Sequence, residues 1–394
     1  MNVNDNRTLW ERVCNYIKIK GKRNAVGEFF SDRFVFRTYE RLIEDSLAAS
    51  LLFTESSAPN SPITVCAGAY DTAVVLLACS SIGRPLIISR LEREGVIFTE
   101  EIPKKEVFLS SDEFRTASAG ILSRKIPISP RRGDSFELIF RSGDGEIRYS
   151  EQAVIHSALA FATATALSMN DCLTYTHSVQ APEGLFCGLV APLLSGGASV
   201  ECPSTKNLMK CLKLSSPTKL FCSSNTASAL LLKLLHIKRL PQKALATNIF
   251  PVRSADPSYL LLKRLSYPRV LYSLGGRLRS VITTEPMSDI SSRAFFSFGI
   301  FAISMMSEKG LVPSMFHYTG DPSAVWRLPL GARADLCFVR SGGVGRVIIH
   351  SPSVREGAFI SDTYLPLQKR SSSSIVTSLS GFVLKNGNIF VVNE

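Results

Sequence analysis

Apolar positions in the first part of the chain alternate between short continuous runs and longer runs with helical spacing. Ile63 to Ala67 and Pro85 to Ser89 are short runs typical of buried strands. Tyr39 to Phe53 carries apolar residues at helical intervals, and Asp71 to Ile82 is an apolar helix candidate. Strands that alternate with helices in this order predict a parallel α/β sheet.

The same alternation continues to about residue 320. Phe136 to Phe140 is expected to be a strand, followed by a polar, glycine-bearing turn and a long helix from about Ser150 to Leu167. The other expected strands are Ser199 to Glu201, Lys219 to Cys222 and Val281 to Thr284, and the other expected helices lie at about 205–213, 225–236 and 288–297.

Beyond about residue 320 the pattern predicts β-hairpins. The first joins Arg333 to Val339 with Val344 to His350, and the second joins Ile375 to Leu384 with Ile389 to Val392. A basic, serine-rich stretch at 369–374 is expected to be a loop. We therefore predict three parts: an α/β lobe at 1–170, a second α/β lobe at 171–320 and a small all-β subdomain at 321–394.

Charge and cysteine content limit the classes of partner and the cellular compartment that we expect. Lys and Arg exceed Asp and Glu by 45 to 33, and the resulting charge of +12 favours anionic partners such as nucleotides, CoA or acidic carrier proteins. Scattered solvated surface charge is the alternative, and basic residues are not interleaved with aromatics as in a nucleic-acid module. Nine cysteines without a CxxC pair indicate buried free thiols, and the histidines lack metal-ligand spacing. We expect a cytoplasmic protein without a signal peptide or membrane span.

Several segments occur in an informative order. Thr38 to Leu42 reads TYERL, 73–85 reads AVVLLACSSIGRP and 184–200 reads GLFCGLVAPLLSGGASV. These segments resemble motifs of the adenylate-forming (AMP-binding) superfamily, which contains acyl- and aryl-CoA synthetases, luciferases and peptide-synthetase adenylation domains. The resemblance runs from about Val35 to Glu394. It implies two helix-flanked, mainly parallel sheets of the adenylate-forming large domain, plus a small C-terminal β-barrel-like unit.

The resemblance places a phosphate loop at Ser142, Gly143 and Gly145, where the family has "TSGTTGxPKG". Arg148 falls at the position of the family's loop lysine if one residue is deleted, and Arg can hold phosphate. In such a loop, a strand, a glycine-rich turn and a helix wrap main-chain N–H groups around phosphate. These four residues are therefore implied as ATP ligands, and a plain β-turn is the alternative reading of this composition.

Two further motifs complete the implied site. Thr284 and Glu285 stand where the family has "GGEPL", so the resemblance implies that they contact the cofactor. Ser307 and Glu308 stand in the place of the end of "YGxTE", which implies a catalytic pair with Glu308 supporting Mg²⁺. The adenine-stacking aromatic of that motif corresponds to Ser304. An exposed loop acid is the alternative for Glu308.

Other positions lack the family's chemistry. The ribose-binding aspartate corresponds to Leu379, the arginine that assists it corresponds to Glu394, and the acyl-pocket histidine corresponds to Ala181. The sequence ends where a lid domain with the catalytic lysine is expected, and without a lid water is not excluded. The losses predict that ATP binds weakly.

The function implied is activation of a fatty or aromatic carboxylic acid with ATP and Mg²⁺, for transfer to CoA or an acyl-carrier protein. The losses predict that this activity is weak or absent, as in a pseudoenzyme. One alternative is an active subunit completed by a separately encoded lid-domain protein. The other is a non-catalytic protein that binds an acyl chain or a carrier protein.

Overall fold

The structure is a computed structural model of the chain. It describes residues 7–30, 33–56, 61–89, 96–99, 107–110, 116, 136–142, 145–202, 204–238, 267–308, 311–318, 325–329, 332–337, 344–352, 357–360, 363–366, 374–384 and 386–391.

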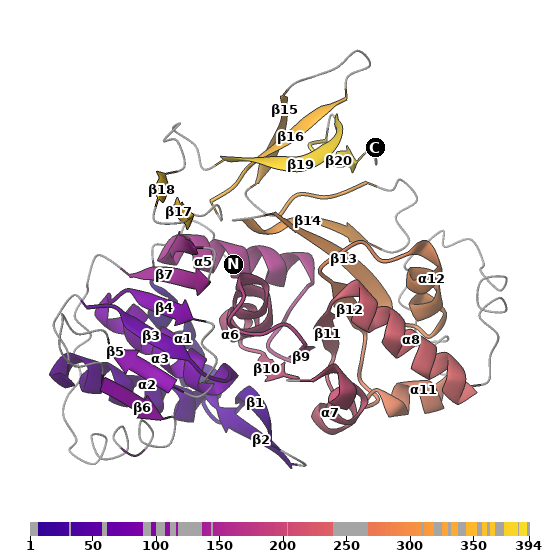
Figure 1. The fold of residues 1–394 in the computed structure, drawn as a ribbon. Coiled ribbons are helices and arrows are strands. Elements are labelled where there is room, and N and C mark those ends of the chain that lie inside the picture. Colours follow the sequence, from indigo (N-terminus) through magenta and orange to yellow (C-terminus); the bar gives the residue numbers. More distant parts are fainter. Residues whose placement is uncertain are drawn as a thin grey trace.

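One eight-stranded sheet, the parallel sheet, runs through the middle of the molecule in the order β14-β13-β12-β11-β9-β10-β1-β2 (Figure 1). All neighbours from β1 to β13 are parallel, and the two edge strands are antiparallel. Its strands are β1 (Asn24–Phe30), β2 (Arg33–Thr38), β9 (Cys172–Tyr175), β10 (Ala198–Glu201), β11 (Lys219–Cys222), β12 (Ser280–Thr283), β13 (Phe301–Glu308) and β14 (Leu311–Tyr318).

A second eight-stranded sheet, the mixed sheet, has the order β18-β17-β8-β7-β4-β3-β5-β6. Only β3, β4 and β7 are parallel to one another, and the outer strands are antiparallel. Its strands are β3 (Ile63–Cys66), β4 (Leu86–Ser89), β5 (Val96–Thr99), β6 (Val107–Ser110), β7 (Glu137–Ser142), β8 (Gly145–Ser150), β17 (Gly357–Ile360) and β18 (Thr363–Pro366).

A small antiparallel sheet lies at the top of Figure 1, in the order β15-β16-β19-β20. It consists of β15 (Arg333–Cys337), β16 (Gly345–His350), β19 (Ser374–Val383) and β20 (Ile389–Val391). The two predicted hairpins supply these four strands. Of the predicted serine-rich loop at 369–374, only Ser374 is described, and it begins β19.

Helices cover the sheets and also lie between them. Helix α3 contacts β3 of the mixed sheet and β1 of the parallel sheet, and α5 contacts β7, β8 and β14. The helices are α1 (Leu9–Lys20), α2 (Tyr39–Ser56), α3 (Ala69–Ile82), α5 (Glu151–Ala164), the π-helix η1 (Glu183–Val190), α6 (Ala191–Ser195), the 3₁₀-helix η2 (Thr205–Asn207), α7 (Leu208–Ser215), α8 (Ser224–Lys238), α11 (Pro268–Ser273) and α12 (Asp289–Ser297).

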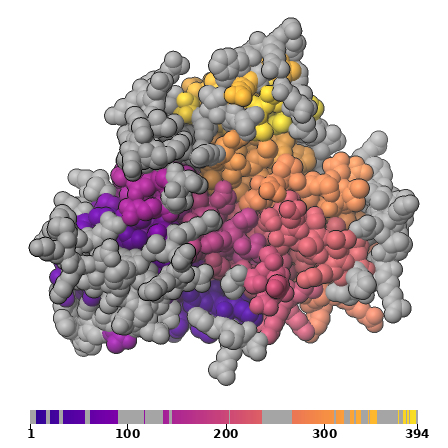
Figure 2. Space-filling model, in the orientation of Figure 1, coloured from indigo at the N-terminus to yellow at the C-terminus, as the bar shows by residue number. Residues whose placement is uncertain are grey.

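The predicted α/β class, with two helix-flanked sheets and a small β unit, is confirmed. The mixed sheet is less parallel than expected, because β5–β6, β7–β8 and β17–β18 enter it as antiparallel pairs. Strands that are far apart in the sequence also pair in these sheets: β1 pairs with β10, and β17 pairs with β8. On the face shown in Figure 2, indigo residues accordingly meet magenta ones. The domain division at 170 and 320 stays a prediction.

Helix α3 is an all-round apolar helix, as its sequence indicates. Every residue from Ala69 to Ser81 is buried, because sheets and helices surround it. It ends at Gly83, whose φ of 70° is a left-handed conformation that glycine adopts without strain, and the Gly83 N–H bonds to the Cys79 carbonyl.

A partly buried carboxylate joins α1, α3 and α5. Glu151 Oε1 accepts hydrogen bonds from the Leu9 main-chain N–H at 2.8 Å and from the Ser80 hydroxyl at 2.5 Å. The Ser80 oxygen in turn accepts from the Trp10 N–H at 3.0 Å. Burial raises the pKa of Glu151, and the two donors oppose this rise. Three helices from distant parts of the chain thus meet at one polar contact.

We predict that Glu151→Gln changes the pH dependence of stability. The folded-state pKa of Glu151 is raised, so the stability of the chain falls as pH rises from about 4.3, the unfolded value, through the folded value. Glutamine keeps the acceptor oxygen and has no charge to bury. We therefore expect the free energy of unfolding of Glu151→Gln, measured in urea, to rise relative to that of the unsubstituted chain as pH increases through this window.

The control is Glu44→Gln, because the Glu44 side chain is exposed on α2. It is expected to change the free energy of unfolding by less than about 0.5 kcal/mol at any pH in the window. If the profiles of Glu151→Gln and the unsubstituted chain run parallel, Glu151 does not carry this pH dependence.

Candidate functional site

Three neighbouring strands of the parallel sheet end at the candidate site. β9, β11 and β12 are adjacent in the sheet and parallel. Their carboxyl ends therefore lead into neighbouring segments, which begin at Thr176, Ser223 and Thr284. In open α/β sheets, ligands bind outside the carboxyl ends of the strands.

His177 follows β9 and lies against β11. Its ring packs on Phe221, with the centroids 4.7 Å apart, and hydrogen bonds to the Cys222 carbonyl. Nε2 is buried and has no partner among the described residues, so the hydrogen bond to the carbonyl is made by Nδ1–H. Burial lowers the pKa of His177, and Glu183, the Cys222 carbonyl and Glu285 oppose this. A neutral ring in this tautomer offers Nε2 as a buried hydrogen-bond acceptor.

Thr284 and Glu285 follow β12 and are held against the same edge. The Thr284 N–H donates to the Cys222 carbonyl at 3.2 Å, and the Glu285 carboxylate accepts from the Ser224 hydroxyl at 2.6 Å. The Thr283 hydroxyl donates to the Glu285 carbonyl at 2.8 Å. Of the predicted cofactor residues, this pair therefore lies with His177 at the carboxyl edge.

The π-helix η1 sets the position of His177. An added Cβ at Gly184 would meet the carbonyl oxygens of Ser178 and His177, and one at Gly188 would meet the Tyr175 ring. Both glycines therefore let η1 approach the end of β9 closely. π-Helical turns are rare and occur frequently at functional sites.

The predicted phosphate loop has a different shape from the one expected. Ser142 ends β7, Gly145 begins β8, and the two residues pair directly across the antiparallel strands. The expected order of strand, turn and helix is therefore wrong: β8 stands between the turn and α5, and only residues 143 and 144 connect the strands. Gly145 has a φ of 136°, open to glycine. Gly143 lies outside the described residues.

Arg148 lies within β8 and is bound by carboxylates of its own hairpin. Its Nη1 lies 3.0 Å from Glu137 Oε2, and its Nη2 lies 3.4 Å from Glu146 Oε2. Arg141 also pairs with Glu146, at 2.7 Å. The positive charges beside the turn are thus matched by negative ones, as expected of a sheet surface.

Ser307 and Glu308 end β13 within a hairpin, where Glu308 pairs with Leu311 of β14. The alternative reading of Glu308 as an exposed loop acid is wrong, because pairing with β14 extends β13 to this residue. Ser307 Oγ is buried without a partner among the described residues. Ser304, at the expected adenine-stacking position, is buried and accepts a hydrogen bond from the Met287 N–H at 3.0 Å.

The described residues do not fit a nucleoside triphosphate. Ser142 and Gly145 pair directly across β7 and β8, at the position where a glycine-rich loop would surround phosphates with main-chain N–H groups. Ser304 has no ring for base stacking, and Leu379 packs against the apolar cluster of the small sheet. Within the described ranges, no group of three or more His, Cys, Asp or Glu side chains could hold a metal ion. Glu308 stays the predicted Mg²⁺ residue from the resemblance alone.

Sequence reasoning missed His177, Glu183 and Ser224 as site residues. The acyl-pocket histidine of the superfamily was assigned to the position of Ala181. The available signal was that His177 directly follows a strand-like run, because the carboxyl ends of parallel strands lie at one edge of a sheet. The sequence did not indicate that β9 and β11 are neighbours in the sheet, since β10 lies between them along the chain.

The fold described above is that of the adenylate-forming enzymes. The crystal structure of VinN superposes with a TM-score of 0.71 at 13% identity, covering 99% of this chain and 100% of that one. The anthranilate CoA ligase AuaEII, in complex with anthranoyl-AMP, has a TM-score of 0.68 at 12% identity, with 99% and 79% covered. A benzoate CoA ligase from Burkholderia xenovorans LB400 has a TM-score of 0.66 at 13% identity, with 98% and 80% covered.

No protein-family profile matches the sequence, and no curated protein sequence matches it. The structural likeness therefore establishes the fold, at identities too low to transfer a reaction. No helix in the described ranges combines the length and the apolar character needed to cross a membrane. The eight cysteines whose side chains are described are free thiols, and seven of them are buried, as predicted.

We predict that Gly184→Ala disturbs the candidate site. The new methyl group would press on the carbonyl oxygens of Ser178 and His177. Overpacking of this kind costs about 1–3 kcal/mol. Urea denaturation is expected to show this loss, and the NMR titration of the His177 ring is expected to shift, because the ring sits on the displaced segment.

Gly68→Ala is the matched control. Gly68 precedes α3 with a φ of −65°, and an added Cβ would lie 3.4 Å from Glu28 Oε1, in ordinary contact. We expect its free energy of unfolding to change by less than about 1 kcal/mol. Equal effects of the two substitutions would show that the approach of η1 to β9 is not tight.

Proposed function

We propose that this chain is an adenylate-forming-fold protein in which ATP-dependent activation of carboxylic acids is weak or lost, while a small acid is still bound beside His177. The observation that carries the proposal is the direct pairing of Ser142 with Gly145 across β7 and β8. Charge stabilisation in adenylation depends on a phosphate clamp, and a strand ladder stands at the position where the resemblance implies that clamp.

The arginines near the turn support the same conclusion. Arg148 is bound by Glu137 and Glu146, so a phosphate would have to compete with two carboxylates. At the ribose position, Leu379 packs on apolar side chains. A polar ligand group there would lose hydrogen bonds to water and gain none.

Acid binding is supported by the carboxyl edge of the parallel sheet. The buried Nε2 of His177 accepts a hydrogen bond, so the ligand it fits presents a donor. The nearby carboxylates of Glu183 and Glu285 also favour a donor over a bare carboxylate. VinN has been crystallised with L-aspartate, and AuaEII with anthranoyl-AMP. L-Aspartate and the anthranoyl group each carry an amino group, which is such a donor.

The remaining partners follow from the proposal as expectations. A carboxylic acid, fatty or aromatic, is the ligand class, and amino-bearing acids are the favoured members. CoA, an acyl-carrier protein and a separate lid-domain protein are proposed only for a chain that retains turnover. ATP and Mg²⁺ are likewise cofactors only in that case. A cytoplasmic location stays a prediction.

We predict that acid-dependent ATP–pyrophosphate exchange stays below about 1% of the rate of a benzoate CoA ligase assayed alongside. Without a phosphate clamp and a ribose contact, the transition state loses several kcal/mol of stabilisation. The panel is octanoate, benzoate, anthranilate and L-aspartate. Thermal shift with ATP and Mg²⁺ is the companion measurement, because a ligand at about 100 times its Kd adds about 2.7 kcal/mol of stability. Robust exchange with any acid would overturn the loss of activity.

The acid site is tested by a matched pair of ligands. Anthranilate carries the amino donor that benzoate lacks, so we expect calorimetry to show tighter binding of anthranilate. His177→Phe keeps a ring against Phe221 and removes Nε2. One neutral hydrogen bond corresponds to about a fivefold change, so the Kd of anthranilate is expected to rise by about that factor while that of benzoate stays constant. Equal effects on both ligands would place the amino group elsewhere.

A further inference from the structure

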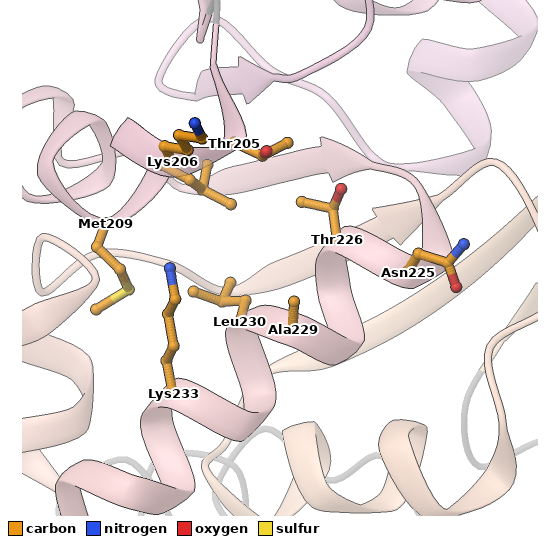
Figure 3. Close-up of a pocket in the computed structure, with 9 residues that line it drawn as sticks. Thr205, Lys206, Met209, Asn225, Thr226, Ala229, Leu230 and Lys233 are labelled. Atoms are coloured by element: carbon orange, nitrogen blue, oxygen red, sulfur yellow. The ribbon is translucent and has the colours of Figure 1, made fainter.

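A separate pocket opens between two segments that follow β10 and β11. It has a volume of about 310 Å³, and its walls come from η2 and α7 on one side and α8 on the other (Figure 3). None of its lining residues is His177, Glu183 or Glu285. It is therefore a cavity that the acid site described above does not use.

The floor of the pocket is apolar. Leu208 and Leu230 belong to a buried core cluster, with 4% and 2% of their surfaces exposed, and Met209 packs against the same cluster. In Figure 3, the Lys233 side chain lies between Met209 and Leu230. A flexible thioether suits ligands of variable shape. The floor thus offers an apolar contact for the body of a ligand.

Two lysines stand on opposite walls. Lys206 lies in η2 and Lys233 in α8, and both side chains are exposed. Figure 3 shows Lys233 rising from α8 into the space beside Met209. Neither lysine forms an ion pair with any carboxylate in the described part of the chain.

The surrounding charge makes these walls purely basic. Residues 204–216 and 224–238 contain five lysines and no Asp or Glu. Lys210 lies over the Phe29 ring at 5.9 Å and Lys213 over the Tyr272 ring at 5.5 Å, so both are directed to other partners. Lys206 and Lys233 are the two lysines among the residues that line the pocket. The carboxylate of Glu285 is nearby but is hydrogen bonded to Ser224.

Polar groups complete the rim on α8. Asn225 and Thr226 line the pocket in the first turn of this helix, where main-chain N–H groups favour negative charge. The Thr226 hydroxyl shares a hydrogen bond with Ser223 at 2.9 Å. The Asn225 side chain is exposed. An anionic head group at this rim would meet ammonium and amide donors together.

We propose that this pocket binds an amphipathic anion, whose carboxylate or phosphate head group lies between Lys206 and Lys233 and whose apolar body rests on Leu208, Met209 and Leu230. The volume equals roughly ten waters, which suits a body of about eight to twelve non-hydrogen atoms. Charge on the rim and apolar contact at the floor each contribute, so neither a free ion nor a neutral alkyl chain satisfies the whole pocket.

The experiment follows the Met209 methyl group by NMR. The chain is labelled at its seven methionine methyl groups, and Met209→Leu assigns the signal. Octanoate and octyl phosphate are titrated as the two anions, with octanol as the neutral probe and inorganic phosphate as the head group alone. We expect the Met209 signal to shift saturably with one or both octyl anions, and much less with octanol or phosphate. Which anion binds more tightly identifies the head group.

The charge requirement is tested with substitutions of exposed residues. K206Q combined with K233Q is expected to raise the Kd of the octyl anion by about tenfold or more, since two charge-assisted contacts are lost. K213Q, which removes the same kind of charge from α7 at a side chain held over Tyr272, is expected to change it by less than about twofold. Raising the salt from about 20 to about 200 mM should weaken binding to the unsubstituted chain.

Three results would overturn the proposal. They are a Met209 signal that does not move with either anion, octanol that binds as tightly as octanoate, and K213Q that weakens binding as much as the double substitution. His177→Phe separates this pocket from the acid site, because it is expected to leave the Met209 shift unchanged. Weaker anthranilate binding with a retained Met209 shift, or the reverse, tells the two sites apart.

Discussion

The close approach of η1 to β9 is the contact on which the candidate site depends. Two glycines four residues apart, Gly184 and Gly188, place the helix main chain directly over the Tyr175 ring and the Ser178 carbonyl. The Ser199 hydroxyl of β10 donates to the Gly188 carbonyl at 2.8 Å, so a polar group of the helix is satisfied from the sheet. Any side chain at the glycines would push η1 outward and would move His177, which lies between the helix and β11.

Much of the fold could be predicted from local pattern. Lys219–Cys222 has the predicted bounds, and helices at 71–82 and 225–236 were found because apolar runs and capping positions are local signals. The strand at Gly145–Ser150 was missed although Ile147 and Tyr149 alternate with charged residues, the period of two that predicts a strand. The sequence analysis placed the turn directly before the helix that begins at about Ser150, so no strand was predicted between them.

The candidate site was less predictable, because it depends on strand order. His177, Ser224 and Glu285 lie within one edge since β9, β11 and β12 are neighbours, although β10 separates the first two in the sequence. Sequence spacing could place each residue after a strand, but the order of strands in a sheet is set by packing on both faces. The resemblance supplied Thr284 and Glu285, and it did not supply His177, because the superfamily's histidine corresponds to Ala181.

The contacts that hold the fold together are separate from the positions at which the resemblance implies nucleotide contacts. The fold rests on helices α3 and α5 buried between two sheets, and those contacts are apolar and indifferent to ATP. The nucleotide positions lie at strand ends and in the small sheet, where a substitution can be absorbed. Leu379 illustrates this: the resemblance implies an aspartate at this position, and the leucine packs against the apolar cluster that contains Trp326. An aspartate at this half-buried position would lose hydrogen bonds to water on folding and would add no apolar contact, so leucine favours folding there.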